Sequence, residues 1–182
     1  MEIYPVLTID QYAALLSCLN EKSAKGIKKI TLLPGMDFRD REKWWNRGEK
    51  RCRPHEGVDI VCCEDDAGKR HFLREGIKVP CLTSGEIVSI CDDFLGKSVF
   101  VRGESRSRGS IVAVHAHILP KVRRGDLVVT GEEIGMIAPT NGSVPAHLHL
   151  SLFRFSPAVP WADIDWNYLN KCDWDLFLNP FA

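Results

Sequence analysis

The stretch "PAHLHLSL" at residues 145–152 holds two of the chain's six histidines, two positions apart. Because side chains alternate between the two faces of a β-strand, a strand here would place His147, His149 and Ser151 on one face. The other face would carry only Leu148, Leu150 and Leu152. The pattern therefore predicts a strand whose leucines lie in a hydrophobic core and whose histidines point together toward a polar site.

A second stretch, "VAVHAHIL" at residues 112–119, repeats this arrangement. In a regular strand His115 and His117 share one face, and the apolar residues between them share the other. Six histidines placed at random would seldom form two such doublets. The repetition indicates that both strands contribute to one site, and the period of two allows both His115 and His117 to face it.

A third candidate contribution lies in "RPHEGVDIV" at residues 53–61, where His55 and Asp59 are four positions apart. In a straight strand these two side chains would be about 13 Å apart, too far to bind one metal ion. The apolar run after Asp59 favours a strand over a helix. Gly57 permits a sharp bend, which would bring His55 back toward the start of the strand.

These pieces together indicate a metal site. Zinc binds imidazole nitrogen and carboxylate oxygen at about 2 Å, and catalytic zinc sites use three protein ligands and leave a fourth position for water. Two neutral histidines and one aspartate leave a net positive charge on the ion, which lowers the pKa of a bound water and polarises a carbonyl. Further histidines beside the ion can move protons or stabilise a developing oxyanion.

The stretch His55-Glu56-Gly57-Val58-Asp59 resembles the H-x-x-x-D motif of the lysostaphin- or LytM-type zinc endopeptidases. The stretch His147-Leu148-His149 resembles their H-x-H motif. The similarity covers roughly residues 50–155, and "NPFA" at residues 179–182 is similar to the family's closing motif. Either motif alone is weak, whereas both in the family's order and separation are specific.

The resemblance implies that His55, Asp59 and His149 bind zinc and that His117 and His147 are catalytic. His115 stands where the family has an aromatic residue, so either His115 or His117 could face the metal, and we favour His117. The implied reaction is hydrolysis of peptide bonds in the cross-bridges or stem peptides of peptidoglycan, by attack of a zinc-bound water. Peptidoglycan peptides are the implied substrate.

Short β-branched runs separated by glycines dominate from about residue 50 and predict a mostly β fold. The resemblance implies an antiparallel sheet or barrel-sandwich hybrid (the duplicated hybrid motif). Before it, a capping box at Thr8–Gln11 and apolar residues at helical spacing predict a helix from about Ile9 to Lys25. We therefore expect an N-terminal helical and strand extension at residues 1–49 and a LytM-like metallopeptidase domain at residues 50–182.

Residues 63–79, "CEDDAGKRHFLREGIKV", form an insertion relative to the family's pattern. Their acidic and basic ends predict a loop at the rim of the substrate groove, with His71 as an exposed loop histidine. The aromatic and acidic segment at residues 165–182 predicts one short helix or irregular segment that covers the sheet.

The composition restricts the partners and the compartment. The chain has 24 basic and 24 acidic residues, and no overall field favours nucleic acid. It has seven cysteines without a C-x-x-C pair, which suits free thiols in a reducing compartment. No stretch approaches the roughly 20 apolar residues of a membrane span, and the sequence has no export signal. We therefore expect a cytoplasmic protein, for which action on the cell wall would require lysis or another export route.

Two other functions are compatible with this reading. A non-catalytic LytM-like scaffold would keep the fold and bind a peptide or a protein, but degenerate members usually lose metal ligands, and this chain keeps those expected. A histidine phosphocarrier on a similar barrel would also use paired histidines. It would not need an aspartate at the position of Asp59, which makes this residue the discriminator.

Overall fold

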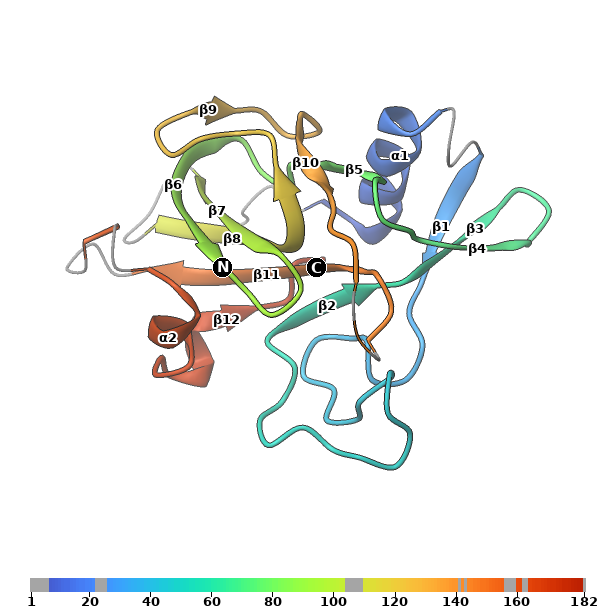
Figure 1. Cartoon of the computed structure of the whole chain (residues 1–182), viewed down its shortest axis with the longest axis horizontal. Helices are drawn as coiled ribbons and strands as arrows, with labels where there is room; N and C mark the ends of the chain where they lie inside the picture. The colour runs from blue at the N-terminus through green and yellow to red at the C-terminus, as the bar shows by residue number, and fades with distance from the viewer. Residues whose placement is uncertain are drawn as a thin grey trace.

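The computed structural model describes residues 7–21, 26–103, 110–140, 142, 144–155, 160–161 and 164–181. Every strand pair in these residues is antiparallel, and a helix, α1 (Ile9–Leu19), precedes the strands. The predicted mostly β fold with antiparallel sheets and an N-terminal helix is confirmed, and the described strands do not close into a barrel (Figure 1).

The larger sheet has nine strands in the described part of the chain. Its main path runs in the order β12-β11-β8-β7-β6-β9; β2 pairs with β11, and β10 pairs with both β8 and β5. The strands are β2 (Gly57–Ile60), β5 (Lys78–Pro80), β6 (Gly85–Asp92), β7 (Lys97–Gly103), β8 (Ser110–Pro120), β9 (Leu127–Val128), β10 (Glu133–Ile137), β11 (Leu148–Phe155) and β12 (Phe177–Leu178).

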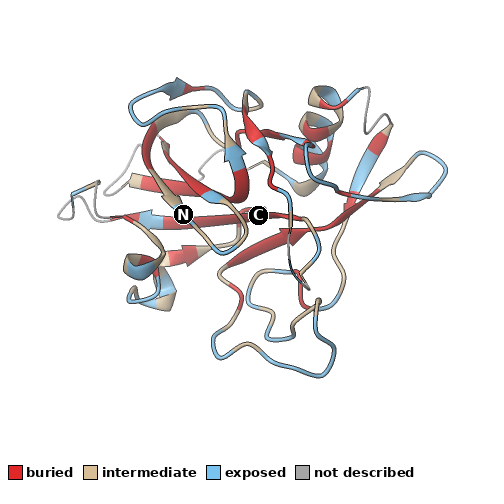
Figure 2. Ribbon diagram, viewed as in Figure 1, coloured by how far each residue is buried: buried red, intermediate tan, exposed pale blue. Residues whose placement is uncertain are grey.

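Strand β11 lies between β2 and β8, and its register brings the histidine motifs together. His149 is opposite Asp59 of β2 on one side and opposite Ala116 of β8 on the other. The leucines at positions 148, 150 and 152 are buried in the main hydrophobic core, as the alternation predicts. Figure 2 shows that β2, β8 and β11 are buried along most of their length.

Strand β8 changes neighbours at His117. Up to Ala116 it pairs with β11, and from Ile118 onward it pairs with β10. His117 has a φ of +65°, in the left-handed region that non-glycine residues seldom adopt. The change of neighbour therefore coincides with an unusual backbone conformation at one of the predicted catalytic histidines.

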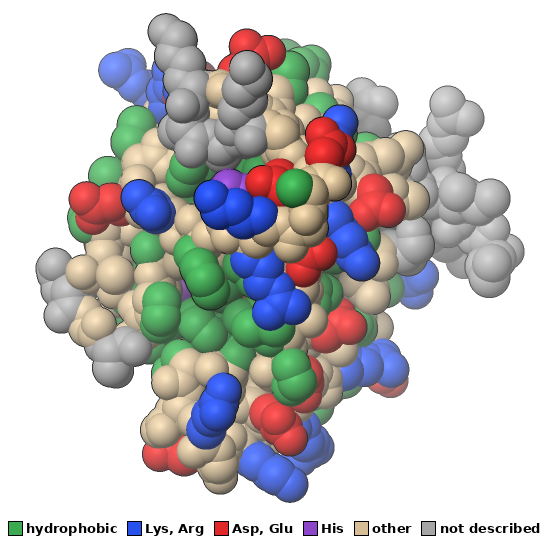
Figure 3. All heavy atoms as spheres, turned by 90° about the vertical axis from the view of Figure 1, so that its right-hand side faces the viewer, with side chains coloured by type: hydrophobic (Ala, Val, Ile, Leu, Met, Phe, Trp, Pro, Cys, Tyr) green, Lys and Arg blue, Asp and Glu red, His purple; other side chains and the backbone are tan. Residues whose placement is uncertain are grey.

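A second, three-stranded sheet joins the N-terminal part of the chain to residues of the insertion. It contains β1 (Ile27–Thr31), β3 (Cys62–Asp65) and β4 (Arg70–Phe72), in the order β1-β3-β4. The insertion is thus mainly a hairpin rather than the predicted loop, and His71 lies on β4 beside Asp65, with 2.7 Å between His71 Nε2 and Asp65 Oδ2. Figure 3 shows acidic and basic side chains interspersed on the face that carries this sheet and α1.

Helix α1 begins with the predicted capping box, in which Thr8 and Gln11 bind each other's backbone N–H groups. Its buried face docks on β5, because Tyr12 donates a hydrogen bond to the Pro80 carbonyl and Asn20 binds both backbone groups of Lys78. The helix ends at Leu19, earlier than predicted, and residues 22–25 lie outside the described residues. The division into residues 1–49 and 50–182 stays a prediction.

The C-terminal segment covers the far end of the larger sheet. It forms a short helix, α2 (Trp166–Leu169), a 3-10 turn, η2 (Trp174–Leu176), and β12, which pairs with β11. Its aromatic residues pack with Phe153 and Phe155 of β11 in a second core cluster. Among the described residues, no helix has the length and apolar character that crossing a bilayer requires.

Candidate metal centre and active site

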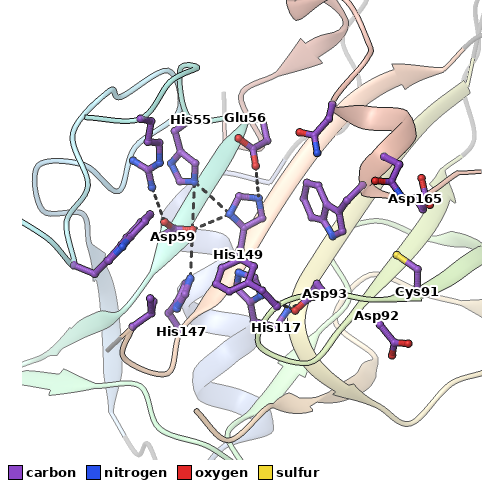
Figure 4. Close-up of a pocket in the computed structure, with 17 residues that line it drawn as sticks. His55, Glu56, Asp59, Cys91, Asp92, Asp93, His117, His147, His149 and Asp165 are labelled. Carbon is purple, nitrogen blue, oxygen red and sulfur yellow. Dashed lines mark hydrogen bonds and ion pairs between the residues drawn. The ribbon is translucent and has the colours of Figure 1, made fainter. Parts of the chain in front are cut away.

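Three buried side chains converge at the point where β2 and β11 run side by side. His55 precedes β2, Asp59 lies within it, and His149 lies opposite Asp59 on β11. Each of the three offers one donor atom, and these atoms all lie within 4.8 Å of one another. The structure thus brings together the three residues that the sequence predicts as metal ligands (Figure 4).

The separations of these donor atoms fit a small divalent ion. His149 Nδ1 is 2.7 Å from Asp59 Oδ1, His55 Nε2 is 3.2 Å from His149 Nδ1, and His55 Nε2 is 3.3 Å from Asp59 Oδ1. Two donors of a tetrahedral zinc ion with bonds of about 2.05 Å lie about 3.3 Å apart. The triangle therefore has nearly the dimensions of one face of such a tetrahedron.

The remaining ring nitrogens of the two histidines are held by other groups. His55 Nδ1 lies 3.1 Å from the Asp37 carbonyl, and His149 Nε2 lies 2.7 Å from the Ser151 hydroxyl. Partners of this kind orient a metal-binding imidazole and select its tautomer. Both rings are therefore fixed with one nitrogen toward the common centre.

The second oxygen of Asp59 is bound by the segment that precedes His55. Trp44 Nε1 donates to Asp59 Oδ2 at 2.7 Å, and Arg51 donates to the same oxygen at 3.0 Å. These donors leave Oδ1 to face the histidines. Although burial acts to raise it, the charge of His55 and a hydrogen bond from His149 hold the pKa of Asp59 well below its usual value.

Gly57 is required here by close approach rather than by a bend. Its φ is outside the left-handed region, so the predicted role of this glycine is wrong. A Cβ atom at position 57 would lie 2.2 Å from the Leu150 carbonyl oxygen and 2.8 Å from His149 Nε2. The absence of a side chain lets β2 approach β11 closely enough for Asp59 to reach His149.

His147 stands at the edge of the three-residue centre, just before β11 begins. Its Nε2 is 3.7 Å from Asp59 Oδ1, and its Nδ1 is 2.8 Å from the Pro145 carbonyl. The Trp44 ring contacts it edge-on, with 5.1 Å between ring centroids. Burial lowers the pKa of His147 to about 4, so the neutral imidazole is favoured.

The two histidines of β8 are separated, and only His117 reaches the site. Its ring centroid is 4.7 Å from that of His147, whereas His115 is fully buried and its Nε2 accepts a hydrogen bond from the Leu82 N–H at 2.9 Å. The regular alternation expected for β8 is wrong at this point, because the positive φ of His117 turns its side chain out of the strand pattern. His117, which we favoured, is the one in the pocket.

A pocket of about 560 Å³ contains all these groups, and Figure 4 shows the histidines around Asp59 on one side of it. Its other walls come from the turn after β6, from the end of α2 and from the segment before His55. None of residues 63–79, all of which the structure describes, lines it, so the insertion does not form the predicted groove rim. The aromatic residues that line it are Trp45, Phe94 and Trp166.

The chain matches no protein-family model and no curated protein, but solved structures share its fold. It aligns with the catalytic domain of the antimicrobial peptidase lysostaphin from Staphylococcus simulans at a TM-score of 0.52 and 21% identity, over 80% of this chain and 86% of that one. For LytU the TM-score is 0.50 at 18% identity, over 87% and 97% of the two chains. For the catalytic domain of the prophage-encoded M23 protein EnpA from Enterococcus faecalis the values are 0.47 and 17%, over 74% and 82%.

The chain has the lysostaphin fold. The family resemblance read from the two histidine motifs is thereby confirmed at the level of the fold. At identities of 18–21% the likeness does not extend to the metal, the bond cleaved or the activity.

Within this lysostaphin fold, sequence reasoning missed the groups that hold the site residues in place. Trp44 and Arg51 bind Asp59, and Asp93 binds His117 with 3.0 Å between Asp93 Oδ1 and His117 Nδ1. These residues belong to no periodic pattern. The only local signal was the run of tryptophans and arginines at residues 44–53, whose polar and aromatic character is unusual for a surface loop.

Proposed function

We propose that the chain is a zinc-dependent endopeptidase that hydrolyses peptide bonds of peptidoglycan, in cross-bridges or stem peptides. The observation that carries the proposal is the convergence of His55, Asp59 and His149 beside two further histidines in one pocket. The assignment of peptidoglycan rests on the resemblance of the two histidine motifs to those of the lysostaphin-type peptidases.

The donor set suits zinc, because it combines two imidazoles and one carboxylate at nearly tetrahedral spacing and leaves the pocket side open. A bound zinc ion would act as a Lewis acid that acidifies water and polarises a peptide carbonyl. His55 would donate through Nε2 and His149 through Nδ1, since the opposite nitrogen of each ring is held by Asp37 or Ser151.

The other two histidines are placed to handle protons and charge. The Nδ1 atoms of both lie near protein oxygens, from Pro145 for His147 and from Asp93 for His117. Their Nε2 atoms are therefore the ones available to a substrate. A neutral His147 can accept a proton from water, and a protonated histidine can stabilise the oxyanion or protonate the departing amine.

The pocket walls are suited to a peptide. Phe94 has 72% of its surface exposed at the rim, next to His117, and a T-shaped contact joins the two rings at 4.6 Å. Trp166 lies 5.7 Å from the His149 ring on the opposite side. Exposed aromatic faces on both sides of the histidines can hold an extended chain across them.

Two observations favour this function over the alternatives. Asp59 is the residue on which His55, His147 and His149 converge, whereas phosphoryl transfer between histidines gains nothing from a carboxylate there. A non-catalytic scaffold would have no need for the additional pair His117 and His147 at 4.7 Å. The cytoplasmic location stays a prediction.

The test is metal analysis together with digestion of peptidoglycans of different bridge chemistry, with the products identified by mass. We expect about one zinc ion per chain and release of defined peptide fragments. His147→Ala should keep the zinc but lose hydrolysis by at least about 100-fold. A purified chain without affinity for zinc, or without peptide products from any peptidoglycan, would refute the proposal.

A further inference from the structure

The turn between β6 and β7 places one carboxylate against a predicted catalytic histidine. Asp93 Oδ1 lies 3.0 Å from His117 Nδ1, and Asp93 Oδ2 accepts a hydrogen bond from the backbone N–H of His117 at 3.0 Å. Asp93 thus contacts both the side chain and the backbone of the same residue. That backbone has a φ of +65°, so the carboxylate binds His117 at the position where β8 leaves its regular path.

The carboxylate is itself fixed by buried and backbone donors. Ser98 Oγ donates to Asp93 Oδ2 at 2.7 Å, and the Leu95 N–H donates to Asp93 Oδ1 at 2.9 Å. Ser98 in turn accepts a hydrogen bond from Trp166 Nε1 at 2.8 Å. The side chains of Asp93 and His117 are only 2% and 7% exposed, so solvent competes little with these bonds.

This arrangement selects one tautomer of His117. A carboxylate can only accept, so Nδ1 must carry the proton that lies between the two residues. In a neutral ring the other nitrogen, Nε2, is then bare and points away from Asp93. The His147 ring lies close by, at 4.7 Å, and both residues line the pocket.

We propose that Asp93 is a positioning residue that holds His117 in the Nδ1–H tautomer and turns its bare Nε2 toward the reacting peptide. This inference rests on the proposed hydrolytic function for its consequence in turnover. Its structural part, the tautomer and orientation of His117, can be measured without turnover.

The experiment compares the zinc-loaded wild-type chain with Asp93→Asn by long-range ¹H–¹⁵N NMR of the histidine rings, over a pH range that includes the neutral ring. In the variant, the amide oxygen should take the place of Oδ2, where two donors converge, and the amide NH₂ should face Nδ1. We therefore expect His117 to switch from Nδ1–H to Nε2–H. The value of kcat should fall by at least about 100-fold, with KM changed by less than about threefold.

A matched control is Asp92→Asn, which removes the same charge from the adjacent residue. The Asp92 side chain is 85% exposed and pairs with Lys97, so the wild-type tautomer of His117 should persist. Ser98→Ala, which removes one donor to Asp93, should lower kcat less than Asp93→Asn does and serves as a second variant if Asp93→Asn does not fold.

A neutral His117 with the Nε2–H tautomer in the wild type would overturn the proposal, and so would an Asp93→Asn variant that folds and keeps wild-type kcat. An inactive wild-type chain would refute only the hydrolytic function, since the tautomer is read independently of turnover.

Discussion

Nδ1 of His149 and Oδ1 of Asp59 lie 2.7 Å apart, although the two residues are 90 positions apart in the chain. They meet because β2 and β11 pair antiparallel with His149 opposite Asp59. Gly57, two residues before Asp59, makes that pairing close. The centre is therefore part of the sheet, and the same contacts should control both zinc binding and folding.

Removal of one donor should abolish zinc binding. We expect His149→Ala to contain less than a tenth of the wild-type zinc, because two remaining donors hold the ion weakly. Zinc that binds only the folded state also stabilises it, so adding a chelator should lower the Tm of the wild type but not that of His149→Ala. Elemental analysis and thermal unfolding measure the two effects. An equal chelator effect on both proteins would contradict the assignment of His149.

Loss of the indole donor should weaken zinc binding without removing a ligand. Trp44→Phe keeps an aromatic ring beside His147 but loses the bond from Nε1 to Asp59 Oδ2. Partners of metal ligands typically contribute about 10- to 100-fold to metal affinity, and we expect a Kd for zinc raised by that factor in chelator competition. Trp45→Phe is the matched control, since Trp45 instead contacts the Arg51 guanidinium. Equal Kd values for Trp44→Phe and the wild type would show that Arg51 alone suffices.

A methyl group at position 57 should separate β2 from β11. Gly57→Ala would place Cβ 2.2 Å from a backbone oxygen of β11, which no side-chain movement relieves. We expect a loss of about 1–3 kcal/mol in the free energy of unfolding, measured in urea, together with weaker zinc binding. Gly142→Ala, where no atom lies within 4 Å of the new Cβ, is the control. Full stability and zinc binding in Gly57→Ala would mean that the two strands are farther apart than the structure has them.

The stability of the fold should fall with acid because of His115. Burial lowers the pKa of His115 to about 3, whereas an unfolded histidine titrates near 6.5. Between these values the unfolded chain binds a proton that the folded chain does not, so stability decreases as pH falls from 6.5 toward 3. The slope from this residue is at most about 1.4 kcal/mol per pH unit.

His115→Gln removes this titration and keeps a side-chain oxygen that can accept from the Leu82 N–H. We expect a flatter dependence of the free energy of unfolding on pH in this variant, measured by urea titrations between pH 4 and 7. Parallel curves for the variant and the wild type would show that His115 is accessible to protons in the folded protein.

The sequence alone was sufficient where local periodicity carries the information. The alternation around His149 predicted the leucine face of β11, the capping box predicted the start of α1, and the two histidine motifs predicted the fold. These features depend on residues close together in the chain, whose geometry follows from the repeat of a strand or helix. The convergence of His55 with Asp59 was also predicted, although for the wrong reason at Gly57.

The tertiary structure decided what depends on non-local contacts. Whether His115 or His117 faces the site depends on the point where β8 exchanges β11 for β10, and alternation within one strand says nothing about its neighbours. Asp93 binds a residue 24 positions away, and Trp44 binds one 15 positions away. Such pairs satisfy the buried polar groups of the site only after the strands have paired, so no local pattern in the sequence marks them.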